Sequence, residues 1–385
     1  MNMKKVMATF FLMILTVVAT ACGENNGENF ASLDLMHIPV INFQPAENFV
    51  DFVVDYALIE TARIKAVSQG YLWALDWEKG SLIKSADQGY NWTHVYDFEN
   101  EIQAVYFDNY GNLFVSTSKD RWSPMGTGEI FKSHDGGLTF RRVLELEAGA
   151  AIWWNIASFY GGLMFVSEYG FKGNEYEPNN ARRIYRSKNF GETWEIMYDP
   201  GETFDLHHHR LLITSDGVVY QSIGDGKNAR IIRSLDKGDT WEVVMRRFLP
   251  TGGIALDDRI LWGLDGGPWM GVALYDRATQ QMTNVFDGYP IFNGPIYDMI
   301  YTGGVVYAIM LSYFGDTAPA GIFYSIDHGN TWNILGRINK TVDWGAGLTI
   351  IVADDDFIYI NAGVPVYRNG EPSRFIGTIR LATVN

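Results

Sequence analysis

Short apolar segments alternate with polar, glycine-rich turns from about residue 57 to the end of the chain. In one well-marked unit, the segments 102–107, 113–116, 129–132 and 139–144 predict four consecutive strands joined by tight turns. Strict alternation of apolar and polar positions is rare within these segments, which is typical of sheets covered on both faces. The pattern therefore predicts an all-β chain built from repeated four-stranded sheets.

One octapeptide recurs five times in register, beginning at Ser85, Ser133, Ser187, Ser234 and Ser325. Its fourth copy, 234–241, reads SLDKGDTW, and the pattern resembles the Asp box (SxDxGxTW) of the BNR repeat found in sialidases and other β-propellers. The aspartate can accept hydrogen bonds from turn N–H groups, the glycine permits positive φ, and the aromatic residue covers the hairpin. We therefore expect the box to have a structural role.

The spacing of the boxes counts the repeated sheets. Successive boxes are 48, 54, 47 and 91 residues apart, so the last gap holds two units, one of them without a box at 254–287. A further unit follows the fifth box, with strands predicted at 348–352, 357–360, 364–368 and 373–380. Seven units predict a seven-bladed β-propeller, to which we assign residues 51–385.

The first 22 residues have the order of an export signal. Lys4 and Lys5 precede an apolar run, 6–18, and the small residues 19–21 precede Cys22, the only cysteine. This order resembles the bacterial lipobox, which implies cleavage before Cys22 and its lipidation. We expect residues 1–21 to be a signal peptide, and 22–50 to hold the lipidated cysteine, a tether and a ring-closing strand within 33–50. The protein would then be exported and anchored to the bacterial cell envelope. An ordinary signal peptide followed by a free thiol is the alternative.

Composition excludes several classes of protein. The 385 residues are 47% hydrophobic, which is enough for a large core and excludes intrinsic disorder. Acidic residues outnumber basic ones by 45 to 30, giving a net charge of −15, which disfavours nucleic acid as a partner. A single cysteine excludes a disulfide within the chain. We expect a monomer that needs no cofactor, although a bound metal ion stays open.

Propeller topology predicts where a ligand binds. The starts of the innermost strands and the ends of the second strands meet around the central funnel, on the face opposite the Asp boxes. The third and fourth units are the richest there, and we predict four catalytic residues: Glu168, Tyr169, His207 and Asp225. The predicted ligand-binding residues are Arg121, Trp154, His209, Arg210, Asp265, Tyr313 and Trp344.

Three interpretations of this cluster stay open. In a glycan site, His207 would carry a proton because imidazole titrates near neutrality, Tyr169 would be the second acid or base, and Trp154 would stack on a sugar ring. Glu168 or Asp225 would orient the imidazole or bind substrate. In a metal site, His207 and His209 would be ligands together with a carboxylate. In the third interpretation, the histidines are a hydrogen-bonded pair at a junction between sheets.

The resemblance to sialidases has a limit. Active sialidases carry an early Phe/Tyr-Arg-Ile-Pro motif, and the nearest stretch here, Arg63-Ile64-Lys65, lacks the proline. We therefore do not expect neuraminidase activity. The resemblance implies a membrane-anchored, sialidase-like propeller that binds a glycan or polysaccharide, with cleavage by hydrolysis or elimination left open. The alternative is a noncatalytic propeller that scaffolds a protein complex of the envelope.

Overall fold

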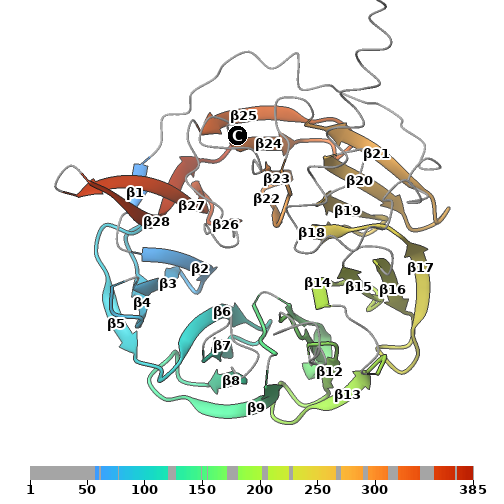
Figure 1. Ribbon diagram of the computed structural model, residues 1–385, viewed down its shortest axis with the longest axis horizontal. Coiled ribbons are helices and arrows are strands. Elements are labelled where there is room, and N and C mark those ends of the chain that lie inside the picture. Colours follow the sequence, from blue (N-terminus) through green and yellow to red (C-terminus); the bar gives the residue numbers. More distant parts are fainter. Residues whose placement is uncertain are drawn as a thin grey trace, which may run out of the picture.

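Seven four-stranded antiparallel sheets form a closed ring in the computed structural model (Figure 1). The structure describes residues 57–59, 62–76, 78–119, 127–148, 150–153, 155–170, 181–201, 207–224, 229–265, 270–288, 294–310, 320–338, 351–368 and 371–384. The predicted seven-bladed β-propeller is confirmed.

Each of blades 1 to 6 uses four consecutive strands, ordered from the axis outward. Blade 1 contains β2 (Ala62–Ser68), β3 (Tyr71–Asp76), β4 (Leu82–Ser85) and β5 (Thr93–Tyr96). Blade 2 contains β6 (Glu101–Phe107), β7 (Leu113–Ser118), β8 (Thr127–Ser133) and β9 (Arg141–Ala148). Blade 3 contains β10 (Ile156–Ser158), β11 (Met164–Ser167), β12 (Ile184–Ser187) and β13 (Glu195–Tyr198). Blade 4 contains β14 (His207–Ile213), β15 (Val219–Gly224), β16 (Arg230–Ser234) and β17 (Glu242–Arg246). Blade 5 contains β18 (Pro250–Ala255), β19 (Arg259–Leu264), β20 (Gly271–Asp276) and β21 (Met282–Asp287). Blade 6 contains β22 (Met299–Thr302), β23 (Val305–Met310), β24 (Ala320–Ser325) and β25 (Asn333–Ile338).

Blade 7 differs from its predicted form. It contains β26 (Ile351–Ala353), β27 (Phe357–Arg368) and β28 (Glu371–Ala382), and its outermost strand is β1 (Ala57–Ile59) from the other end of the described chain. The two strands predicted at 357–360 and 364–368 are wrong, because β27 is one strand that pairs with β28 without a break in register. The stretch 33–50, where a ring-closing strand was expected, lies outside the described residues.

Polar contacts join blade 7 to blade 1. The hydroxyl of Thr378 donates to the carbonyl of Ala62 at 2.9 Å and accepts the N–H of Ile64 at 3.2 Å. The buried amide of Asn361 donates to the carbonyl of Ile64. These bonds close the ring between the last and the first blade.

The five copies of the octapeptide, called Asp boxes here after the motif that they resemble, form the turns between the third and fourth strands. In the fourth box, the carboxylate of Asp236 accepts the hydroxyl of Ser234 at 2.8 Å and both the N–H and the hydroxyl of Thr240, at 2.8 and 2.6 Å. These donors lower the pKa of Asp236 to about 2. Gly238 has a φ of 94°, and a Cβ there would lie 2.7 Å from the Phe165 ring of the neighbouring blade. These contacts support the structural role expected of the box.

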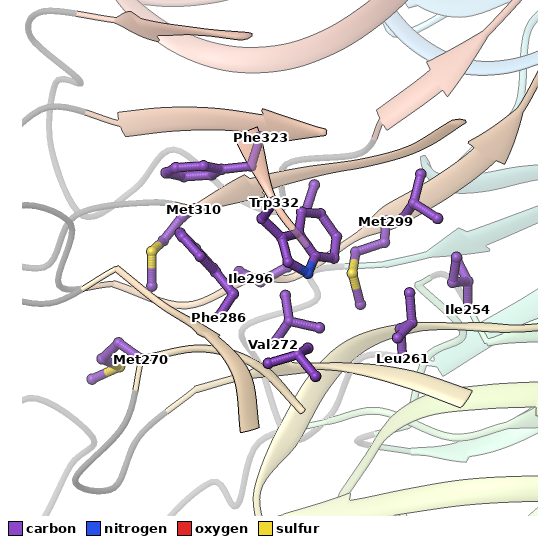
Figure 2. Packing of buried hydrophobic residues seen from close by; sticks show 13 residues of the cluster. Ile254, Leu261, Met270, Val272, Phe286, Ile296, Met299, Met310, Phe323 and Trp332 are labelled. Atoms are coloured by element: carbon purple, nitrogen blue, oxygen red, sulfur yellow. The ribbon is translucent and has the colours of Figure 1, made fainter. Parts of the chain in front are cut away.

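Buried side chains fill the spaces between neighbouring blades. Figure 2 shows one such cluster, in which Trp332 of the last box is 1% exposed and lies against Phe286 and Phe323. The ring centroids of Phe286 and Phe323 are 4.6 Å apart. Because each blade packs against both neighbours, we expect the ring to unfold as a unit. We call the end of the blades that carries the Asp-box turns the box face, and the opposite end the funnel face.

Candidate functional site

Blades 3 and 4 meet at the funnel face through backbone contacts. Tyr169 follows β11, and its N–H and carbonyl exchange hydrogen bonds with Ala151 at 2.7 and 2.8 Å. The N–H of His208, near the start of β14, donates to the carbonyl of Glu168 at 3.2 Å. The buried amide of Asn155 also donates to the carbonyl of His208, at 3.2 Å. These bonds fix the histidine-rich start of β14 beside the end of β11.

Four rings form a continuous column at this junction. Trp153 stacks on Tyr169 with ring centroids 4.3 Å apart and an interplanar angle of 28°. Tyr169 then contacts His207, at 4.5 Å, and the centroids of His207 and His209 are 4.7 Å apart. Trp153 and Tyr169 are nearly buried, whereas His207 is partly exposed. The column therefore presents His207 to solvent on a base of two buried aromatic rings.

Glu168 is buried within this chain and touches no solvent. Its side chain is 0% exposed, one oxygen accepts the Tyr185 hydroxyl at 2.7 Å, and the other accepts the N–H groups of Arg182 and Arg183 at 2.9 and 2.8 Å. Burial raises the pKa of Glu168 to about 7, although the hydrogen bond from Tyr185 opposes the rise. All three donors belong to the segment that leads into β12 or to β12 itself. This placement makes Glu168 a support for blade 3 and gives it no surface for a ligand.

A β-bulge changes the direction of side chains along β14. The pairing shifts between His208 and Leu211, so alternation along the strand is interrupted there. His208 is buried towards Tyr198 of blade 3, with ring centroids 6.2 Å apart, and burial lowers its pKa to about 3. The rings of His207 and His209 lie beside each other, with centroids 4.7 Å apart. Arg210 instead reaches towards blade 5.

Arg210 of blade 4 contacts blades 5 and 6. Its guanidinium donates to the carbonyl of Gly253 in blade 5 at 3.1 Å and pairs with Asp298, which leads into blade 6, at 2.8 Å. Asp298 also accepts the N–H of Met299 and, at 3.2 Å, that of Ile351 in blade 7. Burial raises the pKa of Asp298, although Arg210 opposes the rise. The pair therefore links blades 4 to 7 near the axis.

The structure brings together only part of the predicted site. Tyr169, His207 and His209 lie in the column, Glu168 lies beneath it, and Arg210 lies in the ion pair with Asp298. Asp265 follows β19 and is 9% exposed, with its N–H bonded to the carbonyl of Leu249 at 3.1 Å. The other predictions lie outside the described residues: Cys22, Arg121, Trp154, Asp225, Tyr313 and Trp344.

Sequence reasoning missed the residues that donate hydrogen bonds to the carboxylate of Glu168. The guanidinium groups of Arg182 and Arg183 both pair with Asp199, at 2.8 and 3.0 Å, which fixes the segment that donates to Glu168. Consecutive arginines just before a strand were the available signal. Within the part of the chain that the structure describes, no three side chains of His, Cys, Asp or Glu are grouped so as to hold a metal ion. No helix among those residues is long and apolar enough to span a membrane.

Comparisons with known proteins identify the fold. No protein-family model matches the chain, and no curated protein matches it. The structure titled "YCF48 bound to D1 peptide" superimposes with a TM-score of 0.54 and 15% identity, over 90% of this chain and all of that one. A virginiamycin B lyase from Staphylococcus aureus, in complex with quinupristin, gives a TM-score of 0.55 and 14% identity, over 85% of this chain and 100% of that chain.

A GH74 xyloglucanase from Xanthomonas campestris is similar over 80% of this chain, with a TM-score of 0.54 and 15% identity. The match covers 52% of the xyloglucanase, so this chain spans about half of that structure's length. At such low identities the likeness shows the propeller fold alone, since one fold serves many functions. The three neighbours are respectively a peptide-binding protein, a lyase and a glycoside hydrolase.

Proposed function

We propose that this protein is an exported, lipid-anchored propeller that binds carbohydrate on its funnel face, at the junction of blades 3 and 4. The observation that carries the proposal is the column of Trp153, Tyr169, His207 and His209. Carbohydrate sites combine aromatic faces with a few fixed polar groups. The column supplies the fixed polar group, because the partly exposed imidazole of His207 is held against two stacked, nearly buried aromatic rings.

Binding is better supported than cleavage. Glycoside hydrolysis needs two groups that exchange protons or attack the sugar, usually carboxyl groups in reach of the glycosidic bond. Both oxygens of Glu168 accept hydrogen bonds from blade 3, and its side chain is buried. We therefore assign ligand contact to His207 and its neighbours, and assign Glu168 to the support beneath them.

The ligand is expected to be an uncharged sugar. The chain carries 45 acidic and 30 basic residues, so its overall field repels polyanions. Arg210, one of the predicted ligand-binding residues, is neutralised by Asp298 at 2.8 Å.

Lipid anchoring rests on the order of residues 19–22, and Cys22→Ser should release the protein from membranes. Membrane retention of that variant would contradict lipid anchoring.

The binding test uses the chain from residue 23 onward, because all seven described sheets, from Ala57 to Ala382, lie within it. Neutral oligosaccharides chosen from a glycan array are titrated calorimetrically. His207→Ala should weaken binding at least about tenfold, which equals about 1.4 kcal/mol. The matched control is His94→Ala, since His94 is exposed on the outer strand β5 of blade 1.

Unchanged affinity in His207→Ala would contradict this site. A reducing-end assay on the same sugars separates binding from cleavage. The scaffold alternative predicts a different result, in which no sugar binds and an envelope protein copurifies with the chain through its funnel face.

A further inference from the structure

Exposed apolar side chains gather on one face of the propeller. Among the described residues, ten large hydrophobic side chains are exposed, with exposed fractions from 37% to 79%. Eight lie on or beside turns of the box face: Tyr90, Tyr110, Leu138, Tyr160, Phe190, Leu235, Tyr301 and Ile326. The other two, Ile196 and Val243, lie on the outermost strands β13 and β17. The exposed apolar surface of the described chain is therefore mainly at the box face.

These side chains are held in place by the turns that carry them. The rings of Tyr110 and Phe190 meet edge to face, with centroids 4.9 Å apart, and the hydroxyl of Tyr110 accepts the N–H of Gly161 at 2.9 Å. Phe190 has a φ of 60°, a conformation that bulky residues rarely adopt. Tyr301 meets the ring of His328 in the last box at 5.8 Å. The apolar groups are thus presented to solvent by an ordered scaffold.

Ion pairs moderate the acidic charge at the same face. Acidic side chains on its turns pair with basic ones at 2.6 to 2.7 Å, namely Glu192 with Lys132, Asp239 with Arg186, and Asp258 with Arg259. Pairing reduces the repulsion that a protein of net charge −15 would meet at a surface carrying phosphate groups.

The chain that precedes the propeller joins it at the box face. Ala57, the first residue of β1, lies opposite Arg380 in the register of β1 and β28. The guanidinium of Arg380 donates to the carbonyl of Gln88, at 3.1 Å, and to the hydroxyl of Tyr90, at 2.7 Å, both in the first Asp-box turn. Cys22 lies 35 residues before Ala57, a distance of at most about 120 Å along an extended chain.

We propose that the box face docks on a lipid bilayer, with its tyrosines at the level of the headgroups and Leu138 and Leu235 at the acyl boundary. The proposal rests on the anchoring through Cys22 in the proposed function. Each exposed side chain alone binds lipid weakly, but an acyl anchor keeps the face at high local concentration near the bilayer. Docking in this orientation turns the funnel face, with His207, towards the solution.

The test places a fluorescent probe on either face of one blade in the full-length, lipidated protein. Leu138→Cys labels the box face of blade 2, where Leu138 is 79% exposed. Lys119→Cys labels the funnel face of the same blade, where exposed Lys119 directly follows β7. Cys22 is the only native cysteine, and acylation protects it from the label. Vesicles of phosphatidylcholine and phosphatidylethanolamine carry a quencher on the acyl chain.

Quenching of the Leu138→Cys probe should exceed that of the Lys119→Cys probe by at least about threefold. Adding Tyr90→Ser and Tyr160→Ser should remove this difference, whereas the control pair Ile196→Ser and Val243→Ser should keep it. Equal quenching of the two probes, or stronger quenching at Lys119→Cys, overturns the docking. So does crosslinking of the box face to another protein in cells without quenching in vesicles.

One further readout separates docking from sugar binding, and another tests the lipid anchoring that both proposals share. An acyl mass missing from Cys22 overturns that anchoring, and with it the docking. Sugar binding by the vesicle-bound protein should be unchanged by Tyr90→Ser and Tyr160→Ser, and its absence in every variant would contradict the proposed function while leaving the quenching result intact.

Discussion

Glu168 offers a sharp test of whether this part of the site is structural. Glu168→Ala removes the acceptor of two buried backbone N–H groups and of the Tyr185 hydroxyl. An unsatisfied buried donor costs about 1–3 kcal/mol, so three of them, partly relieved by entering water, should lower the free energy of unfolding by about 3–5 kcal/mol. Glu168→Gln keeps an oxygen for the two N–H groups, and its amide can donate to Tyr185. Its cost should stay below about 1.5 kcal/mol.

The pH dependence of stability tests the burial of Glu168 independently. The pKa of Glu168 rises from 4.5 to about 7 on folding, so the folded protein holds a proton that the unfolded chain releases between these values. Stability from this group is present below pH 4.5 and lost as the pH rises through 7. His208 acts oppositely, because its pKa falls from 6.5 to about 3 and its stability is gained as the pH rises. Both variants and the wild type share His208, so the difference between them isolates Glu168.

The assay is urea unfolding followed by tryptophan fluorescence at pH 6 and pH 8. Between pH 6 and pH 8, the free energy of unfolding of Glu168→Gln should rise by roughly 1.4 kcal/mol relative to that of the wild type, which is the value of one pKa unit. The reasoning is refuted if Glu168→Ala and Glu168→Gln cost the same, or if the wild type and Glu168→Gln change equally with pH. If Glu168→Gln were fully stable but lost sugar binding, Glu168 would instead be assigned to ligand contact.

Three further outcomes are expected. Trp332→Ala should lower the free energy of unfolding by about 3–5 kcal/mol, because the Trp332 side chain is 1% exposed between blades 5 and 6. Urea unfolding measures this loss, and a value below about 1 kcal/mol would contradict the packing. Arg210→Met should lower the free energy of unfolding by about 3–5 kcal/mol at pH 8, because it leaves Asp298 buried without its partner. In a double-mutant cycle, adding Asp298→Asn should recover part of this loss, whereas additive effects would show that the two groups are not coupled. Asp236→Asn should keep a higher melting temperature than Asp236→Ala, because Asn189 accepts the N–H of Thr193 in the third box at 3.0 Å; equal melting temperatures would argue against the turn's hydrogen bonds.

The sequence by itself determined the architecture. Five boxes and one doubled gap were sufficient to count seven blades, because each box is a local structure whose serine, aspartate and glycine bond to one another within five residues. The boxless fifth blade was also located, since the predicted unit 254–287 contains β19, β20 and β21, although β18 begins earlier, at Pro250. Backbone topology then placed the end of β11 beside the start of β14.

Only the tertiary structure decided which polar residues are available to a ligand. Sequence patterns cannot show that Arg182, Arg183 and Tyr185 surround Glu168, or that Arg210 crosses to Asp298, because these partners depend on how blades approach one another. The bulge after His208 likewise redirects Arg210, and the unbroken β27 leaves the outermost position of blade 7 to β1. Local hydrogen bonds are written in short stretches of sequence, whereas burial and charge pairing arise from contacts between residues far apart in the chain.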